Sequence, residues 1–103
     1  MTVKEISKYT ELTFDGIVVL DIYAPWCNPC KNISAFFENM AEKYESAKIH
    51  FFKYNCSENQ ELASLLEVSS IPTFIVFEKG EIKERLSGAN KDQLKAMLER
   101  CLN

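Results

Sequence analysis

Apolar residues recur along the chain in two patterns, one typical of strands and one of helices. Residues 17–23 are apolar and β-branched on both faces apart from Asp21, as in a central strand that helices cover on each side. Similar runs predict further strands over residues 3–6, 48–55, 73–77 and 82–87. Spacings of three and four predict helices over residues 8–14, 30–44 and 58–66, and a last helix that begins at an Asn90 cap with Gln93 three residues later.

The three longer predicted helices each carry an apolar stripe. In order along the chain, the stripes consist of Ile33, Phe36, Phe37, Met40, Ala41 and Tyr44, then Leu62, Leu65 and Leu66, and finally Leu94, Met97, Leu98 and Cys101. A strand, a helix and a second strand follow one another over residues 17–55, which predicts a parallel pair. The turn at residues 78–81 predicts that the last two strands are antiparallel.

Length and charge limit the class of protein. A chain of 103 residues predicts one domain, residues 1–103, and the net charge of −3 comes without a basic stripe, so we expect no nucleic-acid partner. The longest apolar run, residues 17–20, stops at Asp21, so we expect neither a signal peptide nor a membrane-spanning helix. The resulting expectation is a cytoplasmic protein, and in that reducing compartment a Cys-X-X-Cys pair is more often catalytic or metal-binding than structural.

Candidate chemistry centres on Trp26-Cys27-Asn28-Pro29-Cys30, between the central strand and the helix that follows it. With Cys27 at the helix start and Cys30 one turn further, the two sulfurs face each other closely enough to form a disulfide. The free N–H groups and the helix dipole at this end favour the thiolate of Cys27. Pro29 fits the first helical turn because it presets the backbone angle and loses no hydrogen bond there.

Simpler interpretations of these residues remain open. A zinc site that combines the pair with Cys56 and His50 or Cys101 is disfavoured because the sequence has no second paired-ligand motif. Residue by residue, the simpler interpretations are a partly solvated Asp21, a core Trp26, an ordinary strand-end charge at Lys53, a plain turn proline at Pro72, a free thiol at Cys56 and core filling by Cys101.

The order of these motifs resembles that of the thioredoxin family over essentially the whole chain. The resemblance rests on Asp21, Trp26-Cys27-x-Pro29-Cys30-Lys31, Lys53, Ile71-Pro72-Thr73, the Gly80 turn and Ser87-Gly88-Ala89-Asn90. It implies the α/β thioredoxin fold, a central mixed sheet flanked by helices on both faces. It also places the redox pair at the exposed start of the second helix.

The resemblance further implies a mechanism and a set of roles. Cys27 attacks a disulfide of a partner protein to give a mixed disulfide, and Cys30, the more buried thiol, attacks Cys27 to release the reduced partner. Asp21 matches a buried carboxylate that accepts the proton of Cys30. Burial should raise the pKa of Asp21, and Lys53 on the next strand should moderate that rise.

The family also has a groove that accepts the partner protein. Pro72 matches its cis-proline, beside which an extended substrate segment pairs as an added strand. The substrate-binding residues carried over are Trp26, Asn28, Pro29, Ile71, Pro72, Gly88 and Ala89. Two positions depart from the family: Asn28 replaces the usual glycine, which affects the redox potential, and Ala35 replaces a proline that bends the helix.

By resemblance, the chain is a monomeric protein-disulfide reductase that maintains cell redox homeostasis and takes part in electron transport. It needs no bound cofactor or metal, and its electrons come from NADPH through a flavin-dependent reductase. Two different functions stay open: a disulfide oxidase or isomerase of the same fold, and a thioredoxin-fold binding subunit without enzymatic activity.

Overall fold

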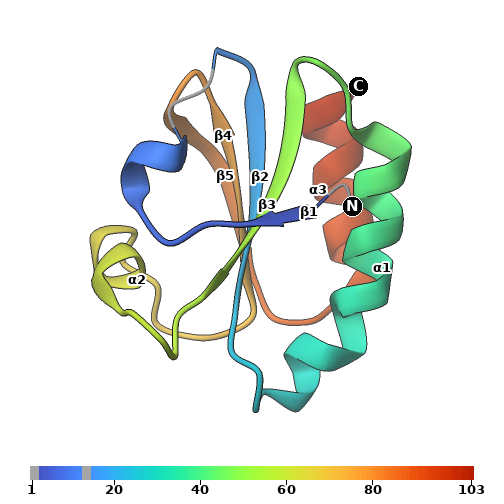
Figure 1. Cartoon of the computed structure of the whole chain (residues 1–103). Coiled ribbons are helices and arrows are strands. Elements are labelled where there is room, and N and C mark those ends of the chain that lie inside the picture. Colours follow the sequence, from blue (N-terminus) through green and yellow to red (C-terminus); the bar gives the residue numbers. More distant parts are fainter. Residues whose placement is uncertain (1–2, 13–14) are drawn as a thin grey trace.

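The structure, a computed structural model, describes residues 3–12 and 15–103. Five strands form one sheet in the order β1-β3-β2-β4-β5 (Figure 1). They are β1 (Val3–Glu5), β2 (Ile17–Tyr23), β3 (Ile49–Asn55), β4 (Thr73–Glu78) and β5 (Glu81–Ser87). The central strand β2 pairs in parallel with β3 and antiparallel with β4, which confirms the predicted mixed sheet.

Helices cover both faces of this sheet, as the sequence predicts. The long helices α1 (Asn28–Tyr44) and α3 (Lys91–Leu102) lie on one face, and the short 3-10 helix η1 (Tyr9–Leu12) and α2 (Glu61–Leu65) lie on the other (Figure 1). Residues of β2 alternate between the two cores: Val19 packs in the cluster with α1 and α3, whereas Leu20 packs in the cluster with η1 and α2. Both faces of β2 are therefore apolar because both are buried.

Two predicted helices are shorter than expected. Within the described residues 8–12 of the helix predicted over 8–14, the structure has the 3-10 helix η1, and Thr13 and Phe14 lie outside the described residues. The helix predicted over 58–66 begins only at Glu61, where the Asn59 side chain accepts a hydrogen bond from the Glu61 backbone N–H (2.9 Å). Such side-chain bonds hold the backbone in a turn and compete with a helix.

The prediction for Leu65 is wrong. Leu62 of the five-residue helix α2 and Leu66, the C-cap residue directly after it, are buried in the core on this side of the sheet. Leu65 lies on the solvent side with 66% of its surface exposed. The predicted stripes of α1 and α3 are confirmed, since their residues are buried or pack against the core.

Local signals set the remaining boundaries. The Asn90 side chain accepts a hydrogen bond from the Gln93 backbone N–H (3.0 Å) and so caps α3 as predicted. Lys79 and Gly80 connect β4 and β5 with positive φ angles of 53° and 83°, the backbone of a tight two-residue hairpin. None of the helices in the described part of the chain has the length and apolarity needed to span a bilayer.

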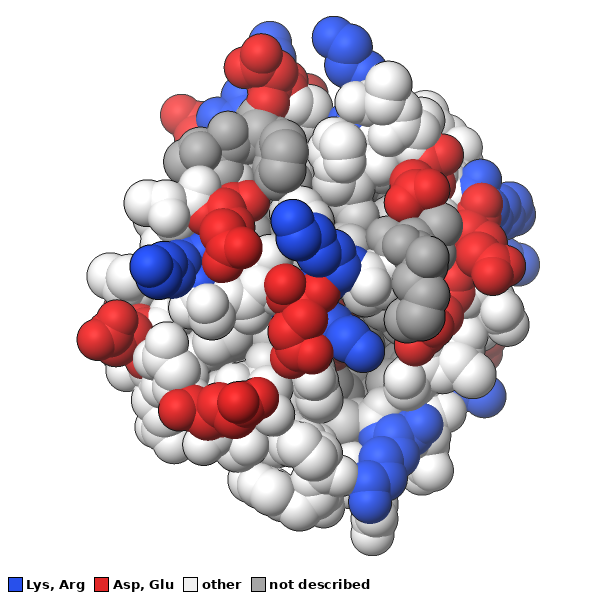
Figure 2. Space-filling view, viewed as in Figure 1, with Lys and Arg blue, Asp and Glu red and all other residues white. Residues whose placement is uncertain are grey.

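The connections β2–α1, α2–β4 and β5–α3 lie together at the lower end of the molecule in Figure 1. In the matching surface view, Lys and Arg are interspersed with Asp and Glu over the upper and middle parts (Figure 2). The lower end, which holds the redox pair, is mostly uncharged on this face.

Candidate active site

The redox pair lies where β2 passes into α1. Cys27 is the N-cap of α1, with an extended backbone (φ −86°, ψ 108°), and its Sγ accepts a hydrogen bond from the Cys30 backbone N–H at 3.2 Å. Cys30 is one turn into the helix, the Cα atoms are 5.2 Å apart, and the two residues form a disulfide. The predicted cap and the predicted bridge are both confirmed.

Both sulfur residues are largely covered, whereas their neighbours are open to solvent. Cys27 is 6% exposed and Cys30 4% exposed, so Cys30 is the more buried of the two by only a small margin. Trp26 is 70% exposed, and Asn28 and Pro29 are exposed as well. Trp26 therefore belongs to the rim of the site and not to the core.

Two further connections meet the pair at the same end of the sheet. The Ile71–Pro72 peptide bond is cis, and Ile71 packs against the cluster of Ala24, Cys27 and Cys30. The Pro72 carbonyl accepts a hydrogen bond from the Gly88 N–H at 2.9 Å, and Gly88 has a φ of +100° that a residue with a Cβ rarely adopts. The exposed Ala89 follows directly. The structure thus places Ile71 against the redox pair and joins Gly88 to the adjoining Pro72.

Asp21 is buried in β2 behind the pair. Its side chain is 6% exposed, and its Oδ1 atom has no hydrogen-bond partner among the described residues. Burial is the largest influence on this carboxyl and raises its pKa to about 7, while Lys53 opposes the rise and Glu38 adds to it. The carboxyl can therefore take up or release a proton near neutral pH.

Lys53 lies directly opposite Asp21 in the parallel pairing of β2 with β3. Its Nζ lies 5.9 Å from the centre of the Tyr23 ring, and the Tyr23 hydroxyl donates a hydrogen bond to Glu5 at 2.8 Å. The predicted pair of Asp21 and Lys53 is thus brought together. Sequence reasoning missed Tyr23, although its place two residues after Asp21 puts it on the same face of the strand.

A cavity of about 250 Å³ connects these residues with the redox pair. Asp21, Tyr23 and Lys53 line it from the sheet, and Cys30, Lys31 and Ser34 line it from α1. Ser34 was also missed by the sequence reasoning, although the spacing of four residues from Cys30 puts both on one helix face.

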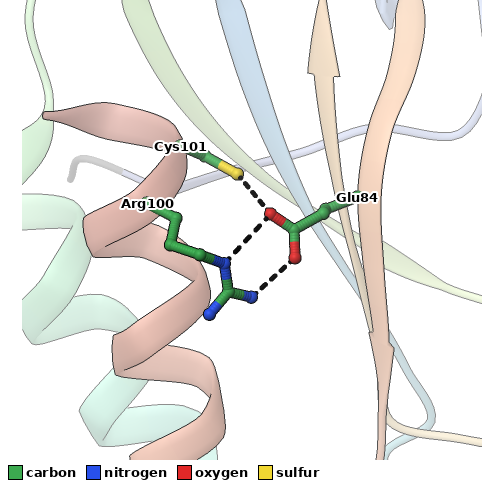
Figure 3. Close-up of polar contacts among 3 residues, drawn as sticks. All are labelled: Glu84, Arg100 and Cys101. Carbon is green, nitrogen blue, oxygen red and sulfur yellow. Dashed lines mark hydrogen bonds and ion pairs between the residues drawn. The ribbon is translucent and has the colours of Figure 1, made fainter.

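The other two cysteines lie outside the disulfide. Cys56 is half-buried and packs against the cluster that contains the redox pair, and burial raises the pKa of its thiol. Cys101 is buried in the core, as predicted for a core-filling residue, and its Sγ donates a hydrogen bond to Glu84 at 3.2 Å (Figure 3). Glu84 also receives two hydrogen bonds from Arg100. Among the described residues, no group of three or more histidine, cysteine or acidic side chains is arranged to hold a metal ion.

Comparison with known proteins gives the same class as the fold and the disulfide. The Thioredoxin family model matches residues 3–100. Human thioredoxin is 42% identical over 84 residues, which cover 82% of this chain and 78% of the human one. Thioredoxin-like protein 1 of Schizosaccharomyces pombe is 42% identical over 99 residues, and the match covers 92% of this chain but only 34% of that longer protein.

Solved structures agree with the sequence matches. Thioredoxin of Malassezia sympodialis superposes with a TM-score of 0.89 at 30% identity, covering 98% of this chain and 91% of that one. A chain from the crystal structure of the ferredoxin:thioredoxin reductase and thioredoxin f2 complex gives a TM-score of 0.86 at 32% identity, covering 96% and 94%.

A disulfide at the start of a helix, on a mixed sheet of this order, defines a dithiol-disulfide oxidoreductase. The chain belongs to the thioredoxin family. Its Cys27–Cys30 pair is the redox-active centre of a protein-disulfide oxidoreductase.

Proposed function

We propose that the chain reduces disulfides in other proteins, with Cys27 as the attacking thiolate and Cys30 as the resolving thiol. The observation that carries this assignment is the unequal setting of the two sulfurs. The Sγ of Cys27 accepts the Cys30 N–H at the helix start, where a thiolate is stabilised, whereas Cys30 and not Cys27 lines the cavity with Asp21. One sulfur is therefore suited to attack and the other to lose its proton later.

The reaction then proceeds in two exchange steps. The Cys27 thiolate attacks a sulfur of the partner's disulfide, forms a mixed disulfide and expels the partner's other sulfur as a thiolate. Cys30 next loses its proton to Asp21 and attacks Cys27, which closes the Cys27–Cys30 bond and releases the second partner sulfur. Two protein thiols are thereby oxidised to a disulfide while the partner disulfide is reduced to two thiols. Lys53 keeps the pKa of Asp21 from rising further.

The partner would bind across the mostly uncharged lower end of the molecule in Figure 2. The proposed contact residues are Trp26, Asn28, Pro29, Ile71, Pro72, Gly88 and Ala89. An extended partner segment that pairs with the backbone next to Pro72 would be held mainly by main-chain hydrogen bonds, which depend little on sequence. Such a groove suits a reductase with many substrates.

We assign the supply of electrons to NADPH through a flavin-dependent thioredoxin reductase, and the place of action to the cytoplasm. The similarity to human thioredoxin supports a reductase partner, and so does the similarity to a chain from a complex of thioredoxin f2 with a ferredoxin:thioredoxin reductase. The same proposal makes the chain a monomer that serves electron transport and cell redox homeostasis.

The reduction potential of the Cys27–Cys30 pair tests the direction of the reaction. Equilibration with a reference dithiol, followed by alkylation and mass spectrometry, should give a value near the figure of about −270 mV for thioredoxin. The purified chain should then also reduce insulin with a chemical dithiol as electron donor. A potential near the isomerase figure of about −180 mV would overturn the proposal and make Asn28, in place of glycine, the residue that shifts the function towards oxidation or isomerisation.

A further inference from the structure

Ser34, one of the residues that line the cavity beside Cys30, has no role in the exchange steps proposed above. Ser34 lies on α1 one turn after Cys30, is half-buried, and lines the cavity together with Asp21 and Lys53. Its hydroxyl can donate one hydrogen bond and accept others. It therefore adds a neutral donor and acceptor to a cavity whose other polar groups are charged or ionisable.

One of the two carboxyl oxygens of Asp21 has no hydrogen-bond partner among the described residues. Its Oδ1 is buried without a hydrogen bond among the described residues, although nearly all buried polar atoms in proteins are hydrogen-bonded to protein or to water. A cavity of about 250 Å³ is large enough for several waters, each of which needs two to four polar partners. Asp21, Lys53 and Ser34 offer such partners from both walls.

We propose that Ser34 is a positioning residue for the second exchange step, whose hydroxyl holds a water between the carboxyl of Asp21 and the thiol of Cys30. In this step the Cys30 S–H bond breaks, its proton passes to the water, and a proton of the same water passes to Asp21. The Cys30 thiolate then forms the bond with Cys27, and the partner sulfur leaves with the bonding electron pair. This proposal rests on the proposed roles of Asp21 and Cys30.

The charges around Asp21 are compatible with such a transfer. Lys53 faces it from β3, Glu38 and Lys31 belong to α1, and Tyr23 belongs to β2. Lys53 and Glu38 act on the Asp21 carboxyl in opposite directions, and burial brings its pKa to about 7. The carboxyl can thus receive the proton at neutral pH and release it again through the open side of the cavity.

The test compares Ser34→Ala and Ser34→Thr with the unmodified chain. Reduced protein is mixed with a substrate protein disulfide, and rapid acid quench with mass spectrometry measures formation and decay of the mixed disulfide from pH 5.5 to 9. We expect Ser34→Ala to slow the decay of the mixed disulfide about 10-fold near pH 7. This is less than the 100-fold or more that general acid–base catalysis contributes in total, because water can partly replace the hydroxyl. Formation through Cys27 should not change, and Ser34→Thr should restore decay to within about twofold.

A double variant, Ser34→Ala with Ala35→Ser, serves as the matched control because it moves the hydroxyl to the exposed neighbouring position. It should behave like Ser34→Ala. Decay at the unmodified rate in Ser34→Ala, while Asp21→Asn is slow, overturns the role of Ser34 alone. Unchanged decay in both Ser34→Ala and Asp21→Asn overturns the proposed role of Asp21 as well.

Discussion

Replacing Asp21 by Asn should stabilise the folded, oxidised protein, and the gain should depend on pH. Burial raises the pKa of Asp21 from its ordinary value of 3.8 to about 7 in the folded chain. Between these two values the folded state holds a proton that the unfolded state releases. The free energy of unfolding of the native chain therefore falls as the pH rises from about 4 to about 7, and this loss persists at higher pH.

The rise in the pKa of Asp21 from 3.8 to about 7 lowers the free energy of unfolding at neutral pH by about 4 kcal/mol, because each pKa unit corresponds to about 1.4 kcal/mol. This is a large fraction of the 5–15 kcal/mol by which domains of this kind are typically stable, roughly a quarter or more. The Asn variant has no ionisable group at this position. Any cost of its buried amide is the same at every pH and does not affect the slope.

Urea unfolding of the two proteins between pH 4 and pH 9 measures this difference. The fluorescence of Trp26, the only tryptophan, and far-ultraviolet circular dichroism report the transition. The gap in unfolding free energy should widen by about 4 kcal/mol from pH 4 to pH 8 in favour of Asp21→Asn. The exposed carboxyl variant Glu42→Gln is the control and should leave the curve of the native chain unchanged. Parallel curves for the Asp21→Asn and native chains would refute the argument.

Three more predictions follow from the site and the fold. Cys30→Ser should accumulate a covalent partner adduct on Cys27, visible as a mass increase under non-reducing conditions, whereas Cys27→Ser should form none. The absence of an adduct on Cys30→Ser would contradict the assignment of Cys27 as the attacking thiol and Cys30 as the resolving thiol. Lys53→Gln removes the charge that lowers the pKa of Asp21. In urea unfolding between pH 4 and pH 9, the free energy of unfolding should therefore stop falling at a higher pH than in the native chain. The same pH dependence in both proteins would show that Lys53 does not act on Asp21. Gly16→Ala places a Cβ 2.1 Å from the Lys48 carbonyl oxygen, which accepts a hydrogen bond from the Ile17 N–H at 2.8 Å. The substitution should therefore lower the free energy of unfolding in urea by about 2–4 kcal/mol. A decrease below about 0.5 kcal/mol would mean that the loop moves aside without strain.

The parts of the fold that the sequence predicted best are those with long, regular apolar patterns. The bounds of β2 agree with the prediction residue for residue, because a strand buried on both faces leaves a continuous apolar run. The segment around α2 was predicted less well. There, a local hydrogen bond that the Asn59 side chain accepts delays the start of the helix, and a three-leucine pattern does not reveal which two leucines meet the sheet.

The site was predictable where a residue type has one main use and obscure where it has many. A Cys-X-X-Cys pair at a strand–helix junction and a proline before a strand carry strong signals, and the structure brings them together. Tyr23 and Ser34 carry only the weak signal of their spacing from Asp21 and Cys30, because tyrosine and serine are common on any strand or helix. The relation of Ser34 to Asp21 depends on how α1 lies over β2 and β3, and this packing angle is not contained in the local sequence.

The settings of the four cysteines explain why only two of them form the reactive pair. Cys101 donates a hydrogen bond to the carboxylate of Glu84, and burial and this negative charge raise the pKa of the thiol to about 11. At pH 7 only about 0.01% of such a group is thiolate, the form that attacks a disulfide. Burial also raises the pKa of Cys56, although it packs against the cluster of the redox pair. Cys27 alone lies at a helix start with a backbone N–H directed at its sulfur, so the local backbone, and not the number of thiols, determines which cysteine reacts first.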